Sequence, residues 1–475
     1  MYYTIKLRSL VLSALLFGQA SVTFGNNISV TNTLLLNQNT SDRTIQIHFD
    51  VTWENSWRTS SNESNYDGGW IFVKFRKSGT YDWRHCTLDQ SQFTSGAGAT
   101  FVVPNDGKGA FIHRSADGIG NVSFSGNQLT WLYGDDGVLD GDSVEIKVFA
   151  LEMVYIPEGQ YYLGSGSSTE TNCFMDGNSN VPYLVSGPGE IVTGITSGQL
   201  NVNGGGANGT PIPSTYPNGF NAFWIMKYEC SHQQFADFLN HLTSILATTH
   251  NTSSNFTGSS YPNLSSSTPD RAYNNLGVAQ LIAFADWSGL RPFSELEFEK
   301  ACRGMNIDPV QNEFPWGTTT IVKLESTQIS NGGLPTESVQ SPYLANAAYK
   351  STNGASGPGR PVRVGLFARA TGSTRELSGA TYYGVLNMAD NVQEITIRAG
   401  TITGQSVNAA THGDGDLVTP ITTWQTLAFC LRGSHYNSPW GSGNSNLRTS
   451  DREGSDGNVG TPATSFGIRL ARTEP

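Results

Sequence analysis

Hydrophobic and polar residues alternate along the first third of the chain, from Asn26 to about Leu151. In Thr44–Trp53 every second residue is apolar, and the residues between are polar or charged. Similar short runs, separated by Gly, Asn and Asp, occupy Trp70–Arg76, Ala99–Val103, Ala110–Arg114, Val122–Leu132 and Val144–Ala150. Because successive side chains of a strand point to opposite faces, this pattern predicts an N-terminal all-β sandwich of short antiparallel strands.

The pattern changes beyond this region. Met153–Gly164 is predicted as a strand that enters a loop, and the Gly-, Ser- and Asn-rich tract Ser165–Pro217 as an insertion on the surface. Apolar residues then recur at helical spacing, which predicts helices at His232–Leu242, Val278–Ser288 and Ser294–Arg303. Few helices and many loops, ending in a strand, predict that an α+β domain rich in loops follows the sandwich.

The third predicted helix begins with the capping box Ser294–Glu297, in which the serine side chain and the glutamate side chain each cap a main-chain amide. Glu295 and Glu299 lie near the same end of the helix. We expect these glutamates to cap the helix and to offset its dipole.

The first 25 residues have the order of a signal peptide. Lys6 and Arg8 precede the apolar run Leu10–Phe17, and small residues offer cleavage after Ala20 or after Gly25. The apolar run is too short to span a bilayer, and no later stretch reaches the ~18–20 apolar residues that a membrane helix needs. We therefore expect an exported protein (secreted, periplasmic or at the cell surface) without a membrane span. Residues 1–25 are the signal peptide, 26–151 the β-sandwich domain, and 152–475 a second domain with the insertion at about 165–217.

Composition narrows the possible partners. Only 14% of residues are charged and the formal net charge is −11, without any Lys/Arg cluster, which disfavours nucleic acid. The five cysteines are far apart and form no C-x-x-C pair, which makes a thiolate zinc site unexpected but leaves one or two disulfides possible. They are Cys86, Cys173, Cys230, Cys302 and Cys430.

Six short motifs follow one another along the second domain. They are Met153–Gly164, Arg291–Gly304, Phe314–Gly317, Gly384–Glu394, Leu431–Ser434 and Phe466–Arg472. In this order they resemble the formylglycine-generating enzyme, or sulfatase-modifying factor, family, and the resemblance runs from Met153 to Thr473. It implies a C-type-lectin-like fold with little regular secondary structure and with structural Ca²⁺.

The resemblance also implies a catalytic site that this sequence lacks. The family oxidises a substrate cysteine to formylglycine with two cysteines that bind copper near the C-terminus. Thr449, in the stretch Arg448–Arg452, occupies the position of one of them, and Asn444 the position of the other. Cu(I) requires soft thiolates, which hydroxyl and amide groups do not replace. We therefore expect no bound copper and no catalytic residue. These two substitutions disfavour an enzymatic function.

Iron is not expected either. The related ergothioneine-pathway sulfoxide synthases hold iron with three histidines, contributed largely by an additional helical domain. None of the eight histidines here forms an i,i+4 pair on a predicted helix. His232 and His241 are expected on the exposed side of their helix.

One metal site is implied by the resemblance. The stretch Asn387–Glu394 resembles the family's second Ca²⁺ loop, in which the side chains of Asn387 and Glu394 and the main-chain carbonyls of Asp390 and Val392 bind the ion. An oxygen-only donor set suits this hard cation. The alternative is an ordinary turn with an asparagine cap.

The resemblance also implies that the C-terminal segment, from Leu431 to Arg472, lies over the family's substrate-binding face. Its interior is rich in aromatic, amide and charged residues of the kinds that form binding surfaces. The predicted ligand-binding residues are His435, Tyr436, Asn437, Trp440, Asn444, Asn446, Arg448, Thr449, Asp451 and Arg452. The alternative is a solvated loop whose tryptophan packs into the core.

Three functions remain open. The first is an exported binding or surface-assembly protein that holds a protein, peptide or glycan ligand outside the cytoplasm. The second is a copper-dependent or other oxidase of protein thiols with a rearranged site that uses Cys430 or another thiol. The third is a structural subunit of a cell-surface fibre or complex, assembled through the β-sandwich.

Overall fold

The structure is a computed structural model. It describes residues 27–474 except positions 171, 254–255, 257–259, 342–343, 351–356, 369–373, 418, 420 and 438–444. The predicted signal peptide therefore lies outside the described residues, as do Trp440 and Asn444.

Two large sheets dominate the N-terminal part. The four-stranded sheet has the order β1 (Ser29–Asn39), β2 (Thr44–Arg58), β8 (Gly118–Trp131) and β5 (Leu88–Thr94). The seven-stranded sheet has the order β20 (Ala471–Thr473), β14 (Phe223–Met226), β9 (Val144–Ile156), β3 (Asp67–Lys77), β7 (Ala110–Arg114) and β6 (Ala99–Val102), with β4 (Arg84–His85) paired to β3. Both sheets are antiparallel throughout.

The alternation seen in the sequence places one face of each sheet in a shared core. Ile47, Phe49 and Val51 of β2 are fully buried in one hydrophobic cluster with Ile71 and Val73 of β3. Burying such side chains contributes about 1.5–3 kcal/mol each. This cluster explains why the N-terminal strands form, and the mostly β character of the chain agrees with the sequence prediction.

Strand β9 joins the two predicted domains. It pairs with β3 from Val144 to Val154, and its last residues, Met153–Ile156, also pair with β14. The predicted boundary between Leu151 and Glu152 thus falls inside one strand. The N-terminal part and the following part are continuous through a single sheet instead of being connected by a linker.

The helices are few. They are α1 (His232–Asn240), α2 (Ser244–His250), α3 (Val278–Ser288), α4 (Glu295–Arg303), α5 (Arg375–Ser378) and α6 (Ile402–Gln405). The three predicted helices correspond to α1, α3 and α4. The capping box at Ser294 is present: the Glu297 amide donates to Ser294 Oγ at 3.0 Å and the Ser294 amide to Glu297 Oε2 at 2.9 Å. No helix in the described residues combines the length and the apolar character needed to cross a bilayer.

Short strands and turns complete the fold. The small sheets are β10 (Tyr161–Leu163) with β12 (Tyr183–Val185), β11 (Met175–Asp176) with β13 (Leu200–Asn201), β15 (Ile329–Ser330) with β16 (Ser338–Val339), and β18 (Phe429–Arg432), β17 (Gln393–Ile397) and β19 (Phe466–Gly467). Four 3-10 turns occupy Ser326–Gln328, Thr426–Ala428, Ser445–Leu447 and Glu453–Asp456.

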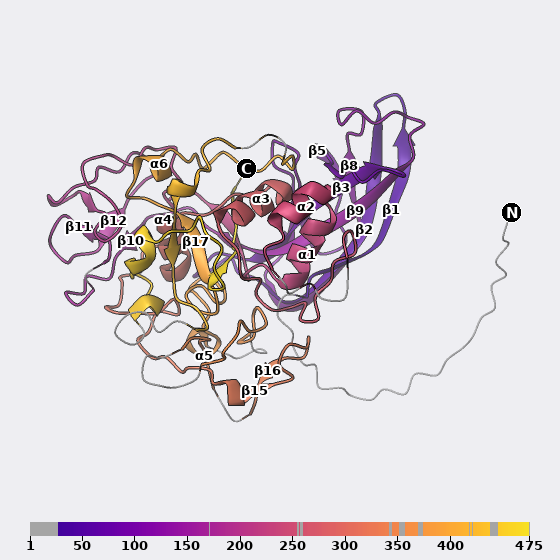
Figure 1. The fold of residues 1–475 in the computed structure, drawn as a ribbon. Coiled ribbons are helices and arrows are strands. Elements are labelled where there is room, and N and C mark those ends of the chain that lie inside the picture. Colours follow the sequence, from indigo (N-terminus) through magenta and orange to yellow (C-terminus); the bar gives the residue numbers. More distant parts are fainter. Residues whose placement is uncertain are drawn as a thin grey trace.

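Figure 1 shows the N-terminal strands at one end of the molecule, β10 to β12 at the other, and α1 to α3 between them. The largest hydrophobic cluster unites Phe72 and Phe149 of the seven-stranded sheet with apolar residues of α1 and α3. The tract Ser165–Pro217 also contributes to this cluster, since Phe174 and Leu200 are fully buried in it. The tract is therefore packed into the body of the protein and is not only a surface insertion.

Candidate functional site

Thr449 lies in an enclosed position. The residue is fully buried, its amide donates to the Glu313 carbonyl at 2.9 Å, and its carbonyl accepts from Arg432 Nη2 at 2.6 Å. Its hydroxyl oxygen is buried and has no hydrogen-bond partner among the described residues. The neighbouring Ser450 accepts from Arg303 through its side chain. Two buried arginines, Arg432 and Arg303, thus hold the stretch Arg448–Arg452 on its buried side.

These arginines belong to a charged network on α4. Glu295, Glu299 and Arg303 follow one another at spacings of four residues, so they share one face of the helix. Arg303 Nη1 donates to Glu299 Oε2 at 2.5 Å, and its Nε donates to Glu313. Every one of these side chains is at least nine-tenths buried.

Two further arginines complete the network from the C-terminal segment. Arg452 donates to both carboxylate oxygens of Glu295, at 2.9 and 3.0 Å, and Arg432 donates to Glu299 at 3.1 Å. The three guanidinium groups and the carboxylates of Glu295, Glu299 and Glu313 balance in charge. Burial raises the pKa of Glu295, but the facing arginines lower it by more, so that it ends below its usual value. The carboxylate is therefore ionised at neutral pH.

The glutamates of α4 differ in part from the sequence prediction. Glu297 caps the helix as expected and also accepts two hydrogen bonds from Arg291, at 2.9 and 2.6 Å. Glu295 and Glu299 instead neutralise buried arginines that are distant in the sequence. The local sequence does not predict that these glutamates neutralise arginines, because the partners of Glu295 and Glu299 lie 157 and 133 residues away.

The stretch Asn387–Glu394 forms a buried turn that leads into β17. Asn387 and Asn391 both adopt positive φ angles, 55° and 68°, which asparagine tolerates better than most residues. Asp390 Oδ2 accepts from the Ala348 amide at 2.6 Å and from Asn387 Nδ2 at 3.1 Å. Glu394 Oε1 accepts from Arg469 Nε at 2.7 Å.

Comparison with known protein families identifies the family of this chain. The model of the sulfatase-modifying factor enzyme 1-like domain matches residues 145–474. The chain belongs to this family. The match begins at the second residue of β9, so the family domain includes all but the first residue of the strand that joins it to the N-terminal sheets. A comparison with curated proteins finds no match.

The thiols of this family member are all enclosed. The five cysteines are buried and unpaired, so the disulfides left open by the sequence do not form in this structure. Burial raises the pKa of Cys173 and of Cys430 to about 12, and it raises the pKa of the other three as well. Cys430 Sγ lies 3.4 Å from the Thr396 hydroxyl. These thiols are protonated at neutral pH, whereas nucleophilic attack and metal binding need the thiolate.

The predicted ligand-binding residues differ in accessibility. Asn437 is exposed, and Arg448 and Asp451 are partly exposed. The remaining described ones are buried: His435, Tyr436, Asn446, Thr449 and Arg452. Arg448 Nη1 lies 3.8 Å from Glu170 Oε1, which links the segment to the tract Ser165–Pro217. Arg452 is enclosed by Glu295 and by the carbonyls of Val202 and Asn203, so its role is to anchor the segment.

Buried carboxyl groups gather at the residues predicted to bind calcium. Glu229, which the sequence did not assign to this site, lies with Asp390 and Glu394 around the guanidinium of Arg469, which also donates to the carbonyls of Met226, Leu386 and Asn387. Burial raises the pKa of Asp390 to about 6 and that of Glu394 to about 7.

A divalent cation would favour the ionised form of these carboxyl groups, and the oxygen donors are of the type that Ca²⁺ takes. Within the described residues, no three side chains of His, Cys, Asp and Glu are grouped to hold a metal ion. A site here would therefore rely on main-chain and amide oxygens beside its carboxylates. These oxygen donors suit Ca²⁺, and the calcium site stays a prediction.

Proposed function

We propose that this protein is an exported, non-catalytic binding or surface-assembly member of the sulfatase-modifying factor family. In this proposal residues 26–151 form a β-sandwich domain, and the family domain has a C-type-lectin-like fold. The observation that carries the proposal is the enclosure of Thr449 together with the burial of all five thiols. An enzyme that oxidises a substrate thiol needs reactive thiolates within reach of the substrate, and these residues cannot supply them.

We place the ligand on the C-terminal segment. The buried network of Glu295, Glu299, Arg432 and Arg452 holds this segment on α4 and supports a fixed backbone. Binding is more favourable when the surface is already ordered, because less conformational freedom is lost. Asn437, Arg448 and Asp451 offer an amide, a guanidinium and a carboxylate on this fixed base.

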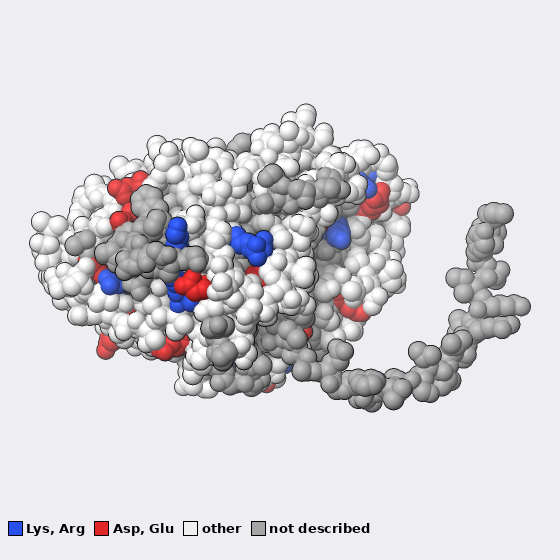
Figure 2. Space-filling view, turned by 60° about the horizontal axis from the view of Figure 1, so that its bottom comes forward, with Lys and Arg blue, Asp and Glu red and all other residues white. Residues whose placement is uncertain are grey.

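A protein, peptide or glycan ligand outside the cytoplasm suits this chemistry. On the face shown in Figure 2, the described Lys and Arg residues lie scattered among uncharged ones. Such a surface lacks the concentrated positive charge that polyanions require. The polar side chains of the segment are of the kinds that bind hydroxyl, amide and carboxylate groups.

We also propose a structural Ca²⁺ held by Asn387, Glu394 and the carbonyls of Asp390 and Val392. The ion would stabilise the turn before β17, and we assign it no chemistry on a substrate. The buried carboxyl groups of Glu229, Asp390 and Glu394 support this assignment.

Screening the mature protein against a glycan array and against a displayed peptide library tests the binding proposal. We expect ligands whose binding is lost in the variant Asn437→Ala/Arg448→Ala/Asp451→Ala. The matched control is Asp82→Ala/Arg84→Ala/Asn105→Ala, which removes the same three side-chain types from exposed positions in the N-terminal part. Equal loss in both variants, or ligands that bind the first variant as well as the wild type, would contradict the proposal.

A further inference from the structure

The seven-stranded sheet has an open edge along β9. On one side β3 pairs with β9 from Val144 to Val154, whereas on the other side β14 reaches only Met153. The Lys227 amide extends this second side by one hydrogen bond, to the Glu152 carbonyl at 2.9 Å. In the part of the chain that the structure describes, no strand pairs with this side of β9 between Val144 and Glu152.

The main-chain groups that point to the open edge can be assigned. The Glu152 carbonyl points to the β14 side, and the Tyr155 amide points to the opposite side, to Tyr66. Because residues two apart in a strand direct their amide and carbonyl groups to the same side, those of Val148 and Ala150 point to the open edge. An added strand forms its hydrogen bonds with such groups.

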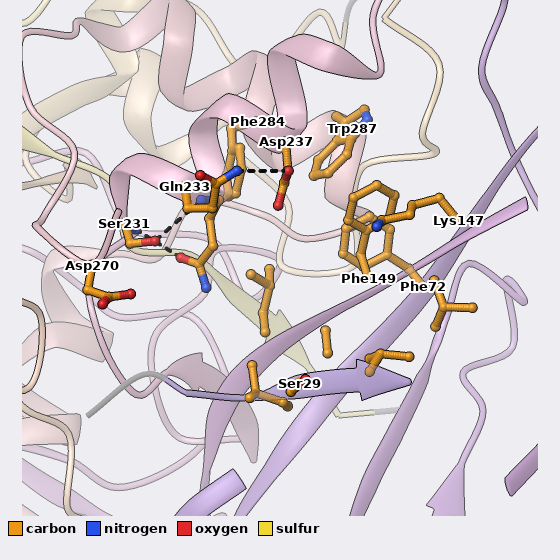
Figure 3. A pocket seen from close by; sticks show the side chains of 16 residues that line it. Ser29, Phe72, Lys147, Phe149, Ser231, Gln233, Asp237, Asp270, Phe284 and Trp287 are labelled. Carbon is orange, nitrogen blue, oxygen red and sulfur yellow. Dashed lines mark hydrogen bonds between the residues drawn. The ribbon is translucent and has the colours of Figure 1, made fainter. Parts of the chain in front are cut away.

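A groove of about 280 Å³ runs along this edge (Figure 3). It is lined by residues of both faces of β9: Phe149 and Leu151, which belong to the core with the helices, and Val148, which belongs to the core between the sheets. A cavity touches both faces of one strand only where that strand is unpaired. The walls are α1 and α3 on one side and Ile28 and Val30, at the beginning of β1, on the other.

The wall formed by α1 carries the carboxylate of Asp237, and Lys147 of β9 and Asp270 also line the groove. Asp237 accepts one hydrogen bond, from Gln233 Nε2 at 3.1 Å, and no Lys, Arg or His of the described residues lies within ion-pair distance of it. Burial raises its pKa above the usual value, and the hydrogen bond from Gln233 and the charge of Lys147 lower it by less. In Figure 3 the Asp237 side chain turns into the space between α1 and β9.

We propose that this groove binds an extended peptide segment of a partner protein, which adds to the edge of β9 as a further strand. Its main chain pairs with Val148 and Ala150. Side chains that alternate along the segment face the two walls, so apolar residues meet Ile28 and Val30 and a basic residue meets Asp237. The added strand would then lie beside β9, between α1 and α3 on one side and Ile28 and Val30 on the other.

The chemistry of the groove favours a peptide over other ligands. Main-chain donors and acceptors at an open sheet edge match an extended backbone. The groove has two carboxylates, Asp237 and Asp270, against one cation, Lys147, which favours a basic side chain among apolar ones. The groove shares no residue with the C-terminal segment, so this inference holds or fails independently of the binding function proposed above.

Titration with three short peptides tests the inference. The probe is acetyl-Val-Lys-Val-Thr-Val-amide, the second peptide replaces its lysine with glutamate, and the third carries N-methyl groups on the main-chain amides of its central residues. Binding is followed by calorimetry with the full mature protein. We expect the first peptide to bind and each of the other two to bind about tenfold more weakly or not at all, because one loses the charge pair and the other the strand hydrogen bonds.

Variants separate the groove from non-specific binding. Asp237→Asn is expected to abolish the preference for lysine over glutamate, whereas the control Asp89→Asn, a carboxylate of β5 outside the groove, leaves it unchanged. Matching thermal unfolding of both variants shows that they fold. Equal affinity for the three peptides, or no binding at millimolar concentration, would overturn the inference. Self-association of the wild type that Asp237→Asn removes, without peptide binding, would instead identify a second copy as the occupant and refute a partner peptide.

Discussion

Replacing Glu295 with methionine is the sharpest test of how the C-terminal segment is held. Glu295 is fully buried and accepts from Arg452 at 2.9 and 3.0 Å, and from the Ala399 amide at 3.0 Å. Methionine fills a similar volume but removes the charge. Among its contacts with described residues, Arg452 then keeps the carbonyls of Val202 and Asn203 and the ring of Phe174, 3.8 Å from its guanidinium carbon, and none of these carries a charge that neutralises it.

The expected loss follows from the burial of this pair. Removing one partner of a buried ion pair costs about 3–5 kcal/mol, because an uncompensated charge stays in the interior. The surface pair of Arg76 and Glu145, whose side chains are 21% and 44% exposed, provides the control. Glu145→Ala is expected to cost less than about 1 kcal/mol, since water solvates the remaining charge.

Urea unfolding at pH 7 measures both free energies. We expect Glu295→Met to lower the unfolding midpoint far more than Glu145→Ala does. The double variant Glu295→Met/Arg452→Met should recover part of the loss, because no unpaired charge remains. A loss in Glu295→Met no larger than in Glu145→Ala, or a double variant worse than the sum of its single variants, would refute this account of the network.

Three further predictions concern other parts of the molecule. Lys74 is 1% exposed and lacks an ion-pair partner within the described residues, and burial lowers its pKa to about 7. The pKa of this lysine is lower in the folded state than in the unfolded state, where it is about 10. Its contribution to the free energy of unfolding therefore rises as the pH increases from 7 to about 10. Lys74→Met should lose that rise and be more stable than the wild type at pH 6 by several kcal/mol, because each unit of pKa shift corresponds to about 1.4 kcal/mol. A variant that is less stable than the wild type in urea unfolding at pH 6 argues against this prediction. Adding Ca²⁺ at about 100 times its dissociation constant should stabilise the protein by about 2.7 kcal/mol, as followed by thermal unfolding, and Glu394→Gln should weaken the effect. An unchanged melting temperature in Ca²⁺ and in chelator contradicts the calcium site. Iodoacetamide followed by mass spectrometry should label none of the five cysteines in the native protein and all of them in urea; rapid labelling of native Cys430 would show that its burial is wrong.

Features set by local sequence were predictable. The period of apolar residues and the flanking Gly289 located α3 at both ends, and the serine and glutamate of the capping box located the start of α4. The alternation in Thr44–Trp53 identified β2 and its buried face. In each case a few consecutive residues determine the structure, because helix caps and strand faces depend on near neighbours.

Features that depend on distant contacts were not predictable. The role of β9 as a strand of both parts arises from pairing with β3 and β14, and the sequence suggested a boundary inside it. His232 was expected on the exposed side of its helix but is 4% exposed, and its Nδ1 lies 3.2 Å from the hydroxyl of Ser266. The expectation was wrong because the chain before Arg271 folds over α1, which helical periodicity does not reveal.

Of the candidate site, the sequence predicted that both thiols are substituted, whereas the enclosure around Thr449 required the structure. The resemblance located Asn444 and Thr449 by short motifs, and a threonine cannot act as a thiolate. Arg432 and Arg452 fix the C-terminal segment through contacts with residues that are distant in the sequence, and only the structure shows these contacts. The position of Asp237 beside an open sheet edge likewise becomes visible only when α1 and β9 are placed together.

Titration of the reduced protein with Cu(I), combined with oxygen uptake in the presence of a thiol peptide, tests the central claim most directly. We predict that the wild type does not bind one equivalent of copper tightly and does not accelerate oxygen uptake, whereas Asn444→Cys/Thr449→Cys gains copper affinity. Binding of one copper per wild-type chain together with oxidation of the peptide thiol would contradict the claim that this protein is a non-catalytic member of its family.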